Sequence, residues 1–444
     1  MEWKEVSKGR WERPSDGMET YFALVASLTA ASSGRVQFMI YSTASVDLKL
    51  DDVVGSLKKA WIQMRHSQPH LATVWEEEKL VYEVPDASAL SEWLDATFIV
   101  ADEVKNSDDL SKSVKSIKQP TLYYLPQSSE LVLRCHHHLL DGTGAFLFWH
   151  CFFTALENPK DVVFGDEYKR LAPSLEHIMG FSKTPSQEVC ERAEKIFMGW
   201  LTNVPAIGPP NSAGETTPKQ PRREQLVVSR QTTDALIKAC KEKGVTVTSA
   251  IHAASILTTV KYADPSTKQS EYISLCQFNL RDFLPAPYNS ADYAVSLYYS
   301  AMPYNIDLPA SFWDLAKNLN NYYQTTFKAH PEMLEIKCEM TRVLTRTFQT
   351  PQAQNAPVPK DPLISSMGIV ERFVQRNYGE TITVKDISFG SECVEGMASL
   401  YIYTFRDQLR MVYSFNDGFQ DPKDIQTYLQ EILNVLTKEL SLPC

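Results

Sequence analysis

Three consecutive histidines, His136–His138, are the residues whose chemistry is easiest to interpret from the sequence. They follow the apolar, strand-like run Leu131–Cys135 and precede Asp141. A turn between a strand and a helix can hold an imidazole rigidly while leaving it open to a substrate. General-base catalysis needs only one such imidazole within reach of a hydroxyl or amine proton. We therefore predict that His137 is a general base.

The neighbours of this base are expected to shape the loop. Successive side chains at the end of a strand point to opposite faces, so His136 and His138 would face the scaffold or help to set the turn. Gly142 would supply a backbone that bends with positive φ or lets a ligand approach closely. The helix-like segment Ala145–Leu156 then follows.

Two other interpretations of the histidines stay open. They could be hydrogen-bonded loop residues without a chemical role. A metal site would need several imidazoles on one face together with further ligands. Adjacent histidines at a strand end diverge, and the chain has no Cys-x-x-Cys or His-Glu-x-x-His spacing. We expect no metal.

Length and composition restrict the class of protein. A chain of 444 residues with 43% hydrophobic residues favours two domains with sizeable cores. A net charge of −10 argues against a nucleic-acid or anionic-membrane surface. No apolar run is long enough to span a bilayer, and the charged stretch Met1–Arg13 does not resemble a signal peptide. Eight scattered cysteines predict a reduced, cytoplasmic setting.

Both halves of the chain alternate helix-like and strand-like segments, which predicts a mixed α/β fold. Residues 203–225 have the proline- and glycine-rich composition of a linker. They would separate a first domain, 1–202, from a second domain, 226–444. The clearest local predictions are two hairpins, over 122–135 and around 406–408, and two helices, 231–243 and 249–262, separated at Gly244.

The pattern His-His-x-x-x-Asp-Gly, formed by His136, His137, Asp141 and Gly142, resembles the signature of the CoA-dependent acyltransferase superfamily. That superfamily includes chloramphenicol acetyltransferase, plant BAHD acyltransferases and peptide-synthetase condensation domains. The segment Lys241–Leu257 is similar to one found early in the second half of such enzymes. The resemblance implies two chloramphenicol-acetyltransferase-like domains, each a mixed β-sheet flanked by helices, with an active-site tunnel between them.

Asn279-Leu280-Arg281 is similar to the Asn-x-Arg segment of BAHD enzymes, whose arginine pairs with the motif's aspartate. Carried over, Arg281 would hold Asp141. The physical argument agrees, because an aspartate beside a base could trap it as imidazolium unless a guanidinium neutralises the carboxylate. Asp141 would then organise the loop. The alternative is that Arg281 is a solvated charge.

One departure from BAHD enzymes concerns their late Asp-Phe-Gly-Trp-Gly pentapeptide. The nearest stretch here is Asp386–Gly390, which lacks the tryptophan. The chain therefore looks closer to fungal secondary-metabolite members, such as the trichothecene O-acetyltransferases. Segments consistent with that group are Pro285–Tyr288, Tyr293–Leu297, Ile364–Gly368 and Ser414–Gly418.

The resemblance implies an O-acyltransferase, a transferase of secondary-metabolite biosynthesis. It would move an acetyl group from acyl-CoA, a co-substrate and not a bound cofactor, to a hydroxyl of a small hydrophobic metabolite. Ser388, Tyr298 or a backbone amide would stabilise the oxyanion. Thr246, Thr248 and Ser249 would contact CoA, and Lys241 and Lys243 would approach its phosphates unless they are simply the solvated end of a helix. We expect a monomer.

Three alternatives remain. A condensation-like enzyme would use the same histidine but take its acyl group from an acyl carrier protein. Another enzyme could keep the scaffold and catalyse a cyclisation or elimination. A non-catalytic binding protein is the third alternative, and the intact histidine motif counts against it.

Overall fold

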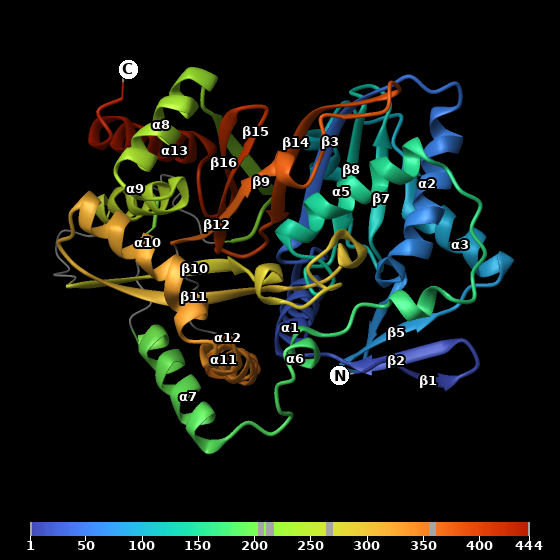
Figure 1. Ribbon diagram of the computed structural model, residues 1–444, viewed down its shortest axis with the longest axis horizontal. Coiled ribbons are helices and arrows are strands. Elements are labelled where there is room, and N and C mark those ends of the chain that lie inside the picture. The colour runs from blue at the N-terminus through green and yellow to red at the C-terminus, as the bar shows by residue number, and fades with distance from the viewer. Residues whose placement is uncertain (1, 203–207, 210–216, 263–269, 355–360, 443–444) are drawn as a thin grey trace. The chain divides into compact units, whose positions relative to one another are not determined.

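A computed structural model describes residues 2–202, 208–209, 217–262, 270–354 and 361–442. The chain divides into two compact units. Unit 1 comprises Met1–Lys183, Asn279–Tyr299 and Val370–Ser391, and unit 2 comprises Thr184–Phe278, Ser300–Ile369 and Glu392–Cys444. Both are mixed helix-and-sheet structures, which confirms the expected fold class (Figure 1).

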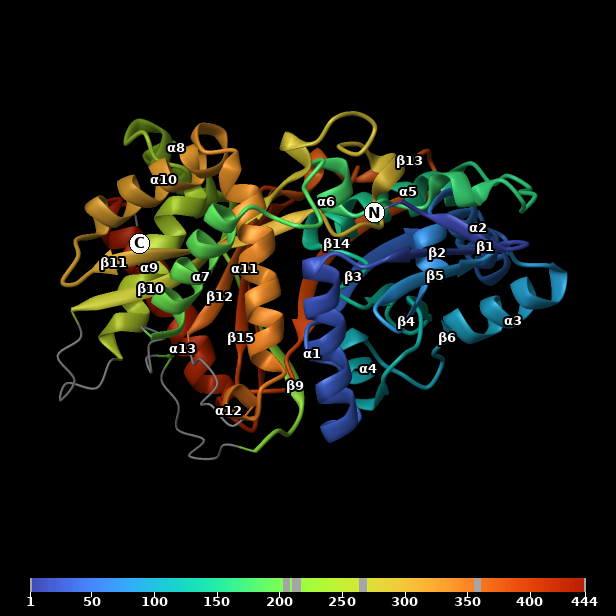
Figure 2. The same ribbon diagram turned by 90° about the horizontal axis from the view of Figure 1, so that it is seen from below.

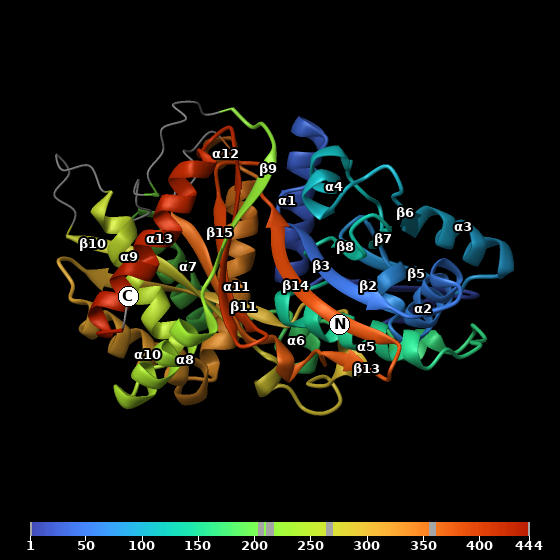
Figure 3. The ribbon, with the colours of Figure 1, turned by 90° about the horizontal axis from the view of Figure 1, so that it is seen from above.

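Unit 1 contains a six-stranded sheet in the order β13-β14-β3-β8-β7-β6. Its strands are β3 (Met39–Leu48), β6 (Phe98–Val100), β7 (Thr121–Leu125), β8 (Glu130–Cys135), β13 (Asn377–Tyr378) and β14 (Ile382–Glu392). The long strand β14 runs beside β3 (Figure 3). A smaller antiparallel sheet contains β1 (Lys4–Ser7), β2 (Arg10–Pro14), β5 (Lys79–Glu83) and β4 (Val74–Glu76).

The helices of unit 1 are α1 (Gly17–Ser33), α2 (Val53–Ser67), α3 (Ala87–Thr97), α4 (Ser107–Ser113), α5 (Gly142–Glu157) and α6 (Leu175–Ile178). Helix α5 lies against the six-stranded sheet (Figure 1). Its Trp149 donates a hydrogen bond to the Ser42 hydroxyl of β3 at 2.9 Å, and its Phe146 packs against Phe389 of β14. These contacts hold α5 against β3 and β14.

Unit 2 is built on a six-stranded sheet in the order β11-β10-β12-β15-β16-β9. The strands are β9 (Pro221–Val227), β10 (Glu271–Asn279), β11 (Tyr299–Asp307), β12 (Pro362–Ile369), β15 (Ala398–Phe405) and β16 (Gln408–Asn416). Its helices are α7 (Gln187–Thr202), α8 (Arg230–Glu242), α9 (Val247–Lys261), α10 (Phe312–Ala329), α11 (Glu332–Phe348), α12 (Pro351–Gln354) and α13 (Pro422–Glu439).

The division differs from the two consecutive halves that the sequence predicts. Helix α7 belongs to unit 2, because its Ala193 and Phe197 are buried against Ile336 and Met340 of α11 (Figure 2). Two later segments, 279–299 and 370–391, return to unit 1. Of the expected linker 203–225, residues 221–225 belong to β9, which pairs antiparallel with β16, and residues 203–207 and 210–216 lie outside the described residues.

The local predictions are confirmed where the pattern was strongest. Strands β7 and β8 form an antiparallel hairpin, as do β15 and β16. Helices α8 and α9 flank Gly244, whose φ of 69° lies in the left-handed region expected after a helix. No helix in the described part of the chain is both long and apolar enough to cross a membrane.

Candidate active site

The histidine triplet begins where strand β8 ends. Strand β8 is buried in its last five residues and stops at Cys135, and α5 begins at Gly142. Asp141 caps α5 with an extended backbone (φ −103°, ψ 177°), and its side chain accepts a hydrogen bond from the Gly144 amide at 2.7 Å. The predicted strand–loop–helix setting of the motif is therefore present.

The three histidines occupy different environments. The His136 ring lies 2.8 Å through Nε2 from the Ile117 carbonyl oxygen. His138 is buried near Trp75, and its ring centroid lies 5.1 Å from that of His136. Burial lowers the pKa of both rings, that of His138 far below its usual value. His136 and His138 thus face the scaffold.

His137 packs against two aromatic rings, Phe22 and Tyr299, whose own centroids lie 6.1 Å apart. Phe22 of α1 stacks on it with centroids 4.0 Å apart and planes 13° apart. Tyr299 lies 5.4 Å away at an interplanar angle of 25°. Burial in these surroundings lowers the pKa of His137 to about 4, although Asp141 and the backbone carbonyls of His137 and Leu140 oppose that shift. The ring is therefore neutral at pH 7.

The two nitrogens of His137 differ in access. Nδ1 is buried and makes no hydrogen bond of good geometry. Nε2 is not among the buried, unpartnered atoms, and the residue as a whole is half-buried. Nε2 is consequently the nitrogen that a substrate proton can reach.

The carboxylate of Asp141 is directed at Arg281. Nη1 of Arg281 lies 2.8 Å from each carboxylate oxygen, and both side chains are only 3% exposed. The Tyr298 amide donates to Oδ2 at 2.7 Å. Together with the Gly144 amide, three donor groups therefore hold the charge of Asp141. This fits the expected organising role of Asp141 and excludes Arg281 as a solvated charge.

The geometry of this pair differs from the two-nitrogen fork with which a guanidinium often binds a carboxylate. Nη1 alone reaches both oxygens, whereas Nη2 donates to the Ser296 hydroxyl at 2.9 Å. Nε of Arg281 is buried without a hydrogen-bond partner. Ser296 also accepts a hydrogen bond at its carbonyl oxygen from the Asp141 amide at 3.3 Å, so it links the two partners.

Gly144 is a glycine that the geometry requires. Gly142 opens α5 and is absent from the residues with positive φ, so the first of its two expected roles, a bend with positive φ, is wrong. The second role, close approach of a ligand, stays a prediction. A Cβ at Gly144 would lie 2.5 Å from the Ala294 carbonyl oxygen and 3.1 Å from Nη2 of Arg281. The absence of a side chain there lets the start of α5 approach the segment that carries Arg281.

The two side chains suggested as oxyanion donors differ in availability. The Tyr298 hydroxyl donates to the Pro173 carbonyl oxygen at 3.0 Å, and its amide is used by Asp141. Tyr298 is thus part of the anchor, with its ring 5.4 Å from the Arg281 guanidinium. Ser388 of β14 is half-buried, and its carbonyl accepts from the Ser42 hydroxyl at 3.3 Å.

The hydroxyls suggested for CoA binding make local hydrogen bonds near the start of α9 in unit 2, and those of Thr246 and Ser249 belong to its cap. Thr246 is the N-cap and accepts from the Ser249 amide at 3.1 Å, while the two hydroxyls lie 2.6 Å apart. Ser249 is fully buried. Thr248 lies 2.7 Å from the Ser366 hydroxyl. The caps explain these residues locally, and a role toward CoA remains a prediction.

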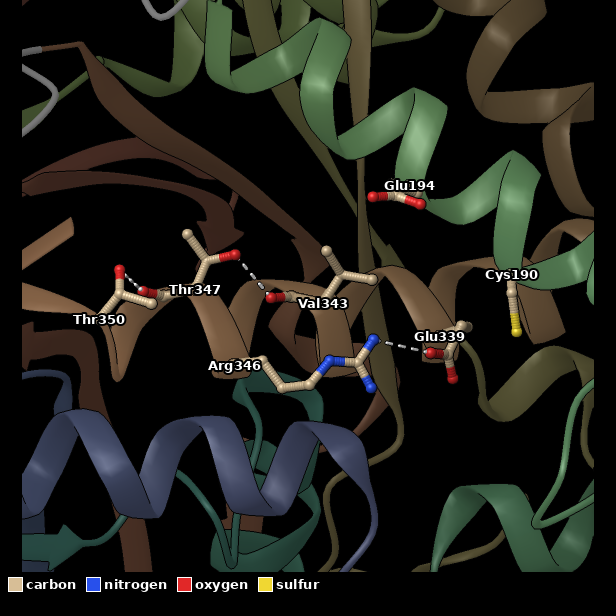
Figure 4. Close-up of a pocket in the computed structure, with 7 residues that line it drawn as sticks. All are labelled: Cys190, Glu194, Glu339, Val343, Arg346, Thr347 and Thr350. Carbon is tan, nitrogen blue, oxygen red and sulfur yellow. Dashed lines mark hydrogen bonds and ion pairs between the residues drawn. The ribbon is translucent and has the colours of Figure 1, made fainter. Parts of the chain in front are cut away.

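An open pocket of about 450 Å³ lies elsewhere, in unit 2 (Figure 4). Cys190 and Glu194 of α7 face Glu339, Arg346 and neighbouring residues of α11. The Glu339 carboxylate is already paired with Arg342 at 3.0 Å and Arg346 at 3.2 Å. This pocket contains none of the residues of the histidine motif.

Known proteins resemble the chain in sequence and in fold. The O-acetyltransferase pigM of Monascus ruber is 29% identical over 462 residues, which cover 100% of this chain and 88% of the relative. The TRI3 trichothecene 15-O-acetyltransferase of Fusarium sporotrichioides superposes with a TM-score of 0.83 at 16% identity, covering 98% of this chain and 97% of the other. No family model matches.

The first condensation domain of the CDA synthetase has a TM-score of 0.67 at 15% identity, over 97% of this chain and 96% of that domain. The chain fits the CoA-dependent acyltransferase superfamily. In this chain, the motif carries a half-buried His137 and an Asp141 neutralised by Arg281.

Four residues around the motif were missed by the sequence interpretation: Phe22, Gly144, Ser296 and Tyr299. Gly144 lies two residues after Gly142 of the motif, but its close contact is with the Ala294 carbonyl oxygen, 150 residues away in the chain. Asp16 and Glu19 form a capping box, a signal that could have revealed α1 and so drawn attention to Phe22.

Proposed function

We propose that the protein is an O-acyltransferase that moves an acetyl group from acetyl-CoA to a hydroxyl of a small hydrophobic secondary metabolite. The observation that carries this proposal is the separation of roles within the motif. His137 keeps one ring nitrogen available, while the charge of Asp141 is held by Arg281. The likeness to the two fungal O-acetyltransferases supports the choice of acetyl group and of acceptor class.

In the proposed reaction, Nε2 of His137 removes the proton of the acceptor hydroxyl as its oxygen attacks the thioester carbonyl. The tetrahedral intermediate collapses with cleavage of the carbon–sulfur bond. The imidazolium then returns its proton to the CoA thiolate, so that the products are an ester and free CoA. No acyl-enzyme is needed, since the gain comes from holding both substrates beside one base.

The low pKa of His137 has two opposite effects on this step. It keeps the lone pair of the imidazole free at neutral pH, but it also makes the ring a weaker base. A negative oxyanion beside the ring would stabilise the imidazolium as it forms. The Ser388 hydroxyl or a backbone amide would donate to that oxyanion, since both donors of Tyr298 are already used.

The test is acyl transfer by the purified protein. Acetyl-CoA and a panel of small alcohols are incubated with wild type, His137→Ala and His177→Ala, the last being a partly exposed histidine of the same unit (38% exposed). Released thiol and the mass of the acylated product are measured. Wild type and His177→Ala should react, and His137→Ala should not. Equal activity of all three proteins would reject His137 as the base.

A carrier-dependent, condensation-like reaction is the second candidate, because the condensation domain shares the fold. Calorimetry with CoA and turnover with an acyl carrier protein separate the two donors. Transfer from the carrier-bound thioester, without CoA binding at millimolar concentration, would replace the first proposal. Transfer from neither donor to any alcohol in the panel would reject both.

A further inference from the structure

The segment 279–299, which we call the strap, connects strands β10 and β11 and belongs to unit 1. It contains two short 3₁₀ turns. The strap carries two groups that hold the Asp141 carboxylate, the Arg281 guanidinium and the Tyr298 amide. Because turns this short supply few backbone hydrogen bonds, side chains from the rest of unit 1 must fix the path of the strap.

Gln68 binds the strap at its second turn. It caps the end of α2 and is 5% exposed. Its Nε2 donates to the carbonyl oxygens of Ala291 at 2.9 Å and Asp292 at 3.0 Å, and its Oε1 accepts from the Val295 amide at 3.2 Å. Both donors and one lone pair of the side-chain amide are therefore used on the strap. A flipped amide would set its oxygen against two carbonyl oxygens, so these partners fix its orientation.

The strap passes from Gln68 to Asp141 within a few residues. Val295, which Gln68 holds, is followed at once by Ser296, whose carbonyl oxygen accepts from the Asp141 amide at 3.3 Å. Two residues later, the Tyr298 amide donates to the Asp141 carboxylate at 2.7 Å. Three residues of chain span roughly 10 Å at most, so a displacement at Val295 reaches the contacts of Asp141 directly.

Helix α5 contacts the same stretch of the strap. A Cβ at Gly144 would lie 2.5 Å from the Ala294 carbonyl oxygen, and the Cys151 thiol lies 3.4 Å from the Ala291 carbonyl oxygen. The close contact at Gly144 can only limit how near the strap comes, so attractive interactions must hold the strap in place. Gln68 supplies part of that attraction through its three hydrogen bonds.

We infer that Gln68 is a positioning residue of the proposed reaction, which holds the strap so that Arg281 and Tyr298 meet the Asp141 carboxylate. This inference rests on the proposed function. Gln68 acts on the reaction only through the backbone of the strap. The inference also gives a role to Tyr293–Leu297, a segment that the resemblance alone had singled out.

A displaced strap should change the charge around His137. The Asp141 carboxylate raises the pKa of His137, against the larger effect of burial. Arg281 neutralises that carboxylate at 2.8 Å. When Arg281 moves away, the full negative charge acts on the imidazole and stabilises its protonated form. The pKa of His137 should then rise, a change that a loss of stability alone would not produce.

The experiment compares Gln68→Met with Gln63→Met. Gln63 lies on the same helix, and its side-chain amide also binds backbone groups, but these belong to Asn158 and Lys160, outside the strap. We expect kcat of Gln68→Met to fall by about tenfold to a hundredfold, as for a small misplacement of a catalytic group. KM for acetyl-CoA, and kcat of Gln63→Met, should stay within about twofold of wild type. Equal kcat values in the two variants would overturn the inference.

Gln68→Asn is the second variant and keeps the test open when Gln68→Met does not fold. It retains the amide but shortens the side chain by one methylene group, so it can form only part of the three hydrogen bonds. Its kcat should lie between those of wild type and Gln68→Met. Wild-type kcat in a folded Gln68→Asn protein would also overturn the inference. Thermal unfolding and circular dichroism verify that each variant is folded.

A readout independent of activity separates this inference from the proposed function. NMR of ring-labelled histidines follows the titration midpoint of His137, and His137→Gln assigns its resonances among the nine histidines. The midpoint should rise from about 4 in Gln68→Met and stay unchanged in Gln63→Met. That rise without acyl transfer by wild type would reject only the proposed function. An active wild type whose midpoint is the same as that of Gln68→Met would reject only the inference.

Discussion

Nη1 of Arg281 contacts both carboxylate oxygens of Asp141 at 2.8 Å, although the two residues are 140 positions apart in the chain. The contact keeps the carboxylate away from the role of a charge partner for His137. In enzymes with a nucleophile–histidine–aspartate triad, the aspartate orients the base through a hydrogen bond. Here the aspartate shapes the loop, which leaves the protonation of His137 to be set chiefly by its burial.

Replacement of His137 by alanine should remove acyl transfer and spare the fold. The expected loss in kcat is about a hundredfold or more, as for removal of a general base. His138→Ala should lower kcat less, because His138 is buried against Trp75 and His136, and its cost should appear mainly in thermal stability. Steady-state kinetics and melting curves of both variants test this prediction. A larger loss of kcat in His138→Ala than in His137→Ala would contradict it.

Asp141→Asn should lower both stability and activity, since it leaves the Arg281 charge buried without its partner. Breaking one side of a buried pair typically reduces the free energy of unfolding by about 3–5 kcal/mol. Asp109→Asn is the matched control, because Asp109 pairs with Lys112 at an exposed site and should change stability by less than about 1 kcal/mol. A double-mutant cycle with Arg281→Met should show coupling in urea unfolding, and strict additivity would contradict a direct interaction.

Gly144→Ala should be strongly destabilising. Its new methyl group would meet the Ala294 carbonyl oxygen at 2.5 Å, a backbone atom that cannot rotate away. We expect a loss of about 2–3 kcal/mol, as for overpacking of a tight site. Gly199→Ala in α7 is the control, because a methyl group there meets no atom within 4 Å, and it should stabilise the helix by roughly 0.5–1 kcal/mol. Equal unfolding midpoints would refute the steric argument.

Stability should depend on pH through His137. Its pKa is about 4 in the folded protein and roughly 6.5 in an unfolded chain. Between these values the unfolded state binds a proton that the folded state excludes, so the free energy of unfolding falls as pH falls from about 6.5 to 4. His70 and His138, whose pKa values are also lowered by burial, act in the same direction. Urea unfolding at several pH values should give a shallower dependence for His137→Gln than for wild type.

The local structure of the motif was predictable because its signals are short-range. The apolar run Leu131–Cys135, the histidines at its end and the N-cap residue Asp141 all act within a few residues. The pair Asp141–Arg281 followed from the resemblance and from the need to neutralise a buried carboxylate. Hairpin β7–β8 was visible for the same reason, since a strand, a turn and a second strand are adjacent in sequence.

The remainder depends on packing between distant segments. Phe22 contacts His137 from α1, a helix whose start carries the buried pair of Arg13 and Glu19. Gly144 packs closely against the Ala294 carbonyl oxygen, and no periodic pattern in the sequence predicts that contact. The division into units could not be predicted from the sequence either, since the contacts of Phe197 with α11 place α7 in unit 2.

The discontinuity of unit 1 has a consequence for biosynthesis. During synthesis, the histidine loop leaves the ribosome long before the segment that carries Arg281, and strand β14 follows later still. Until both have emerged, a nascent chain holds Asp141 without its counter-ion and β3 without its neighbour β14. Co-translational folding of the first 200 residues is therefore incomplete by construction, and a fragment ending near residue 202 should behave as an aggregation-prone intermediate that needs chaperone protection.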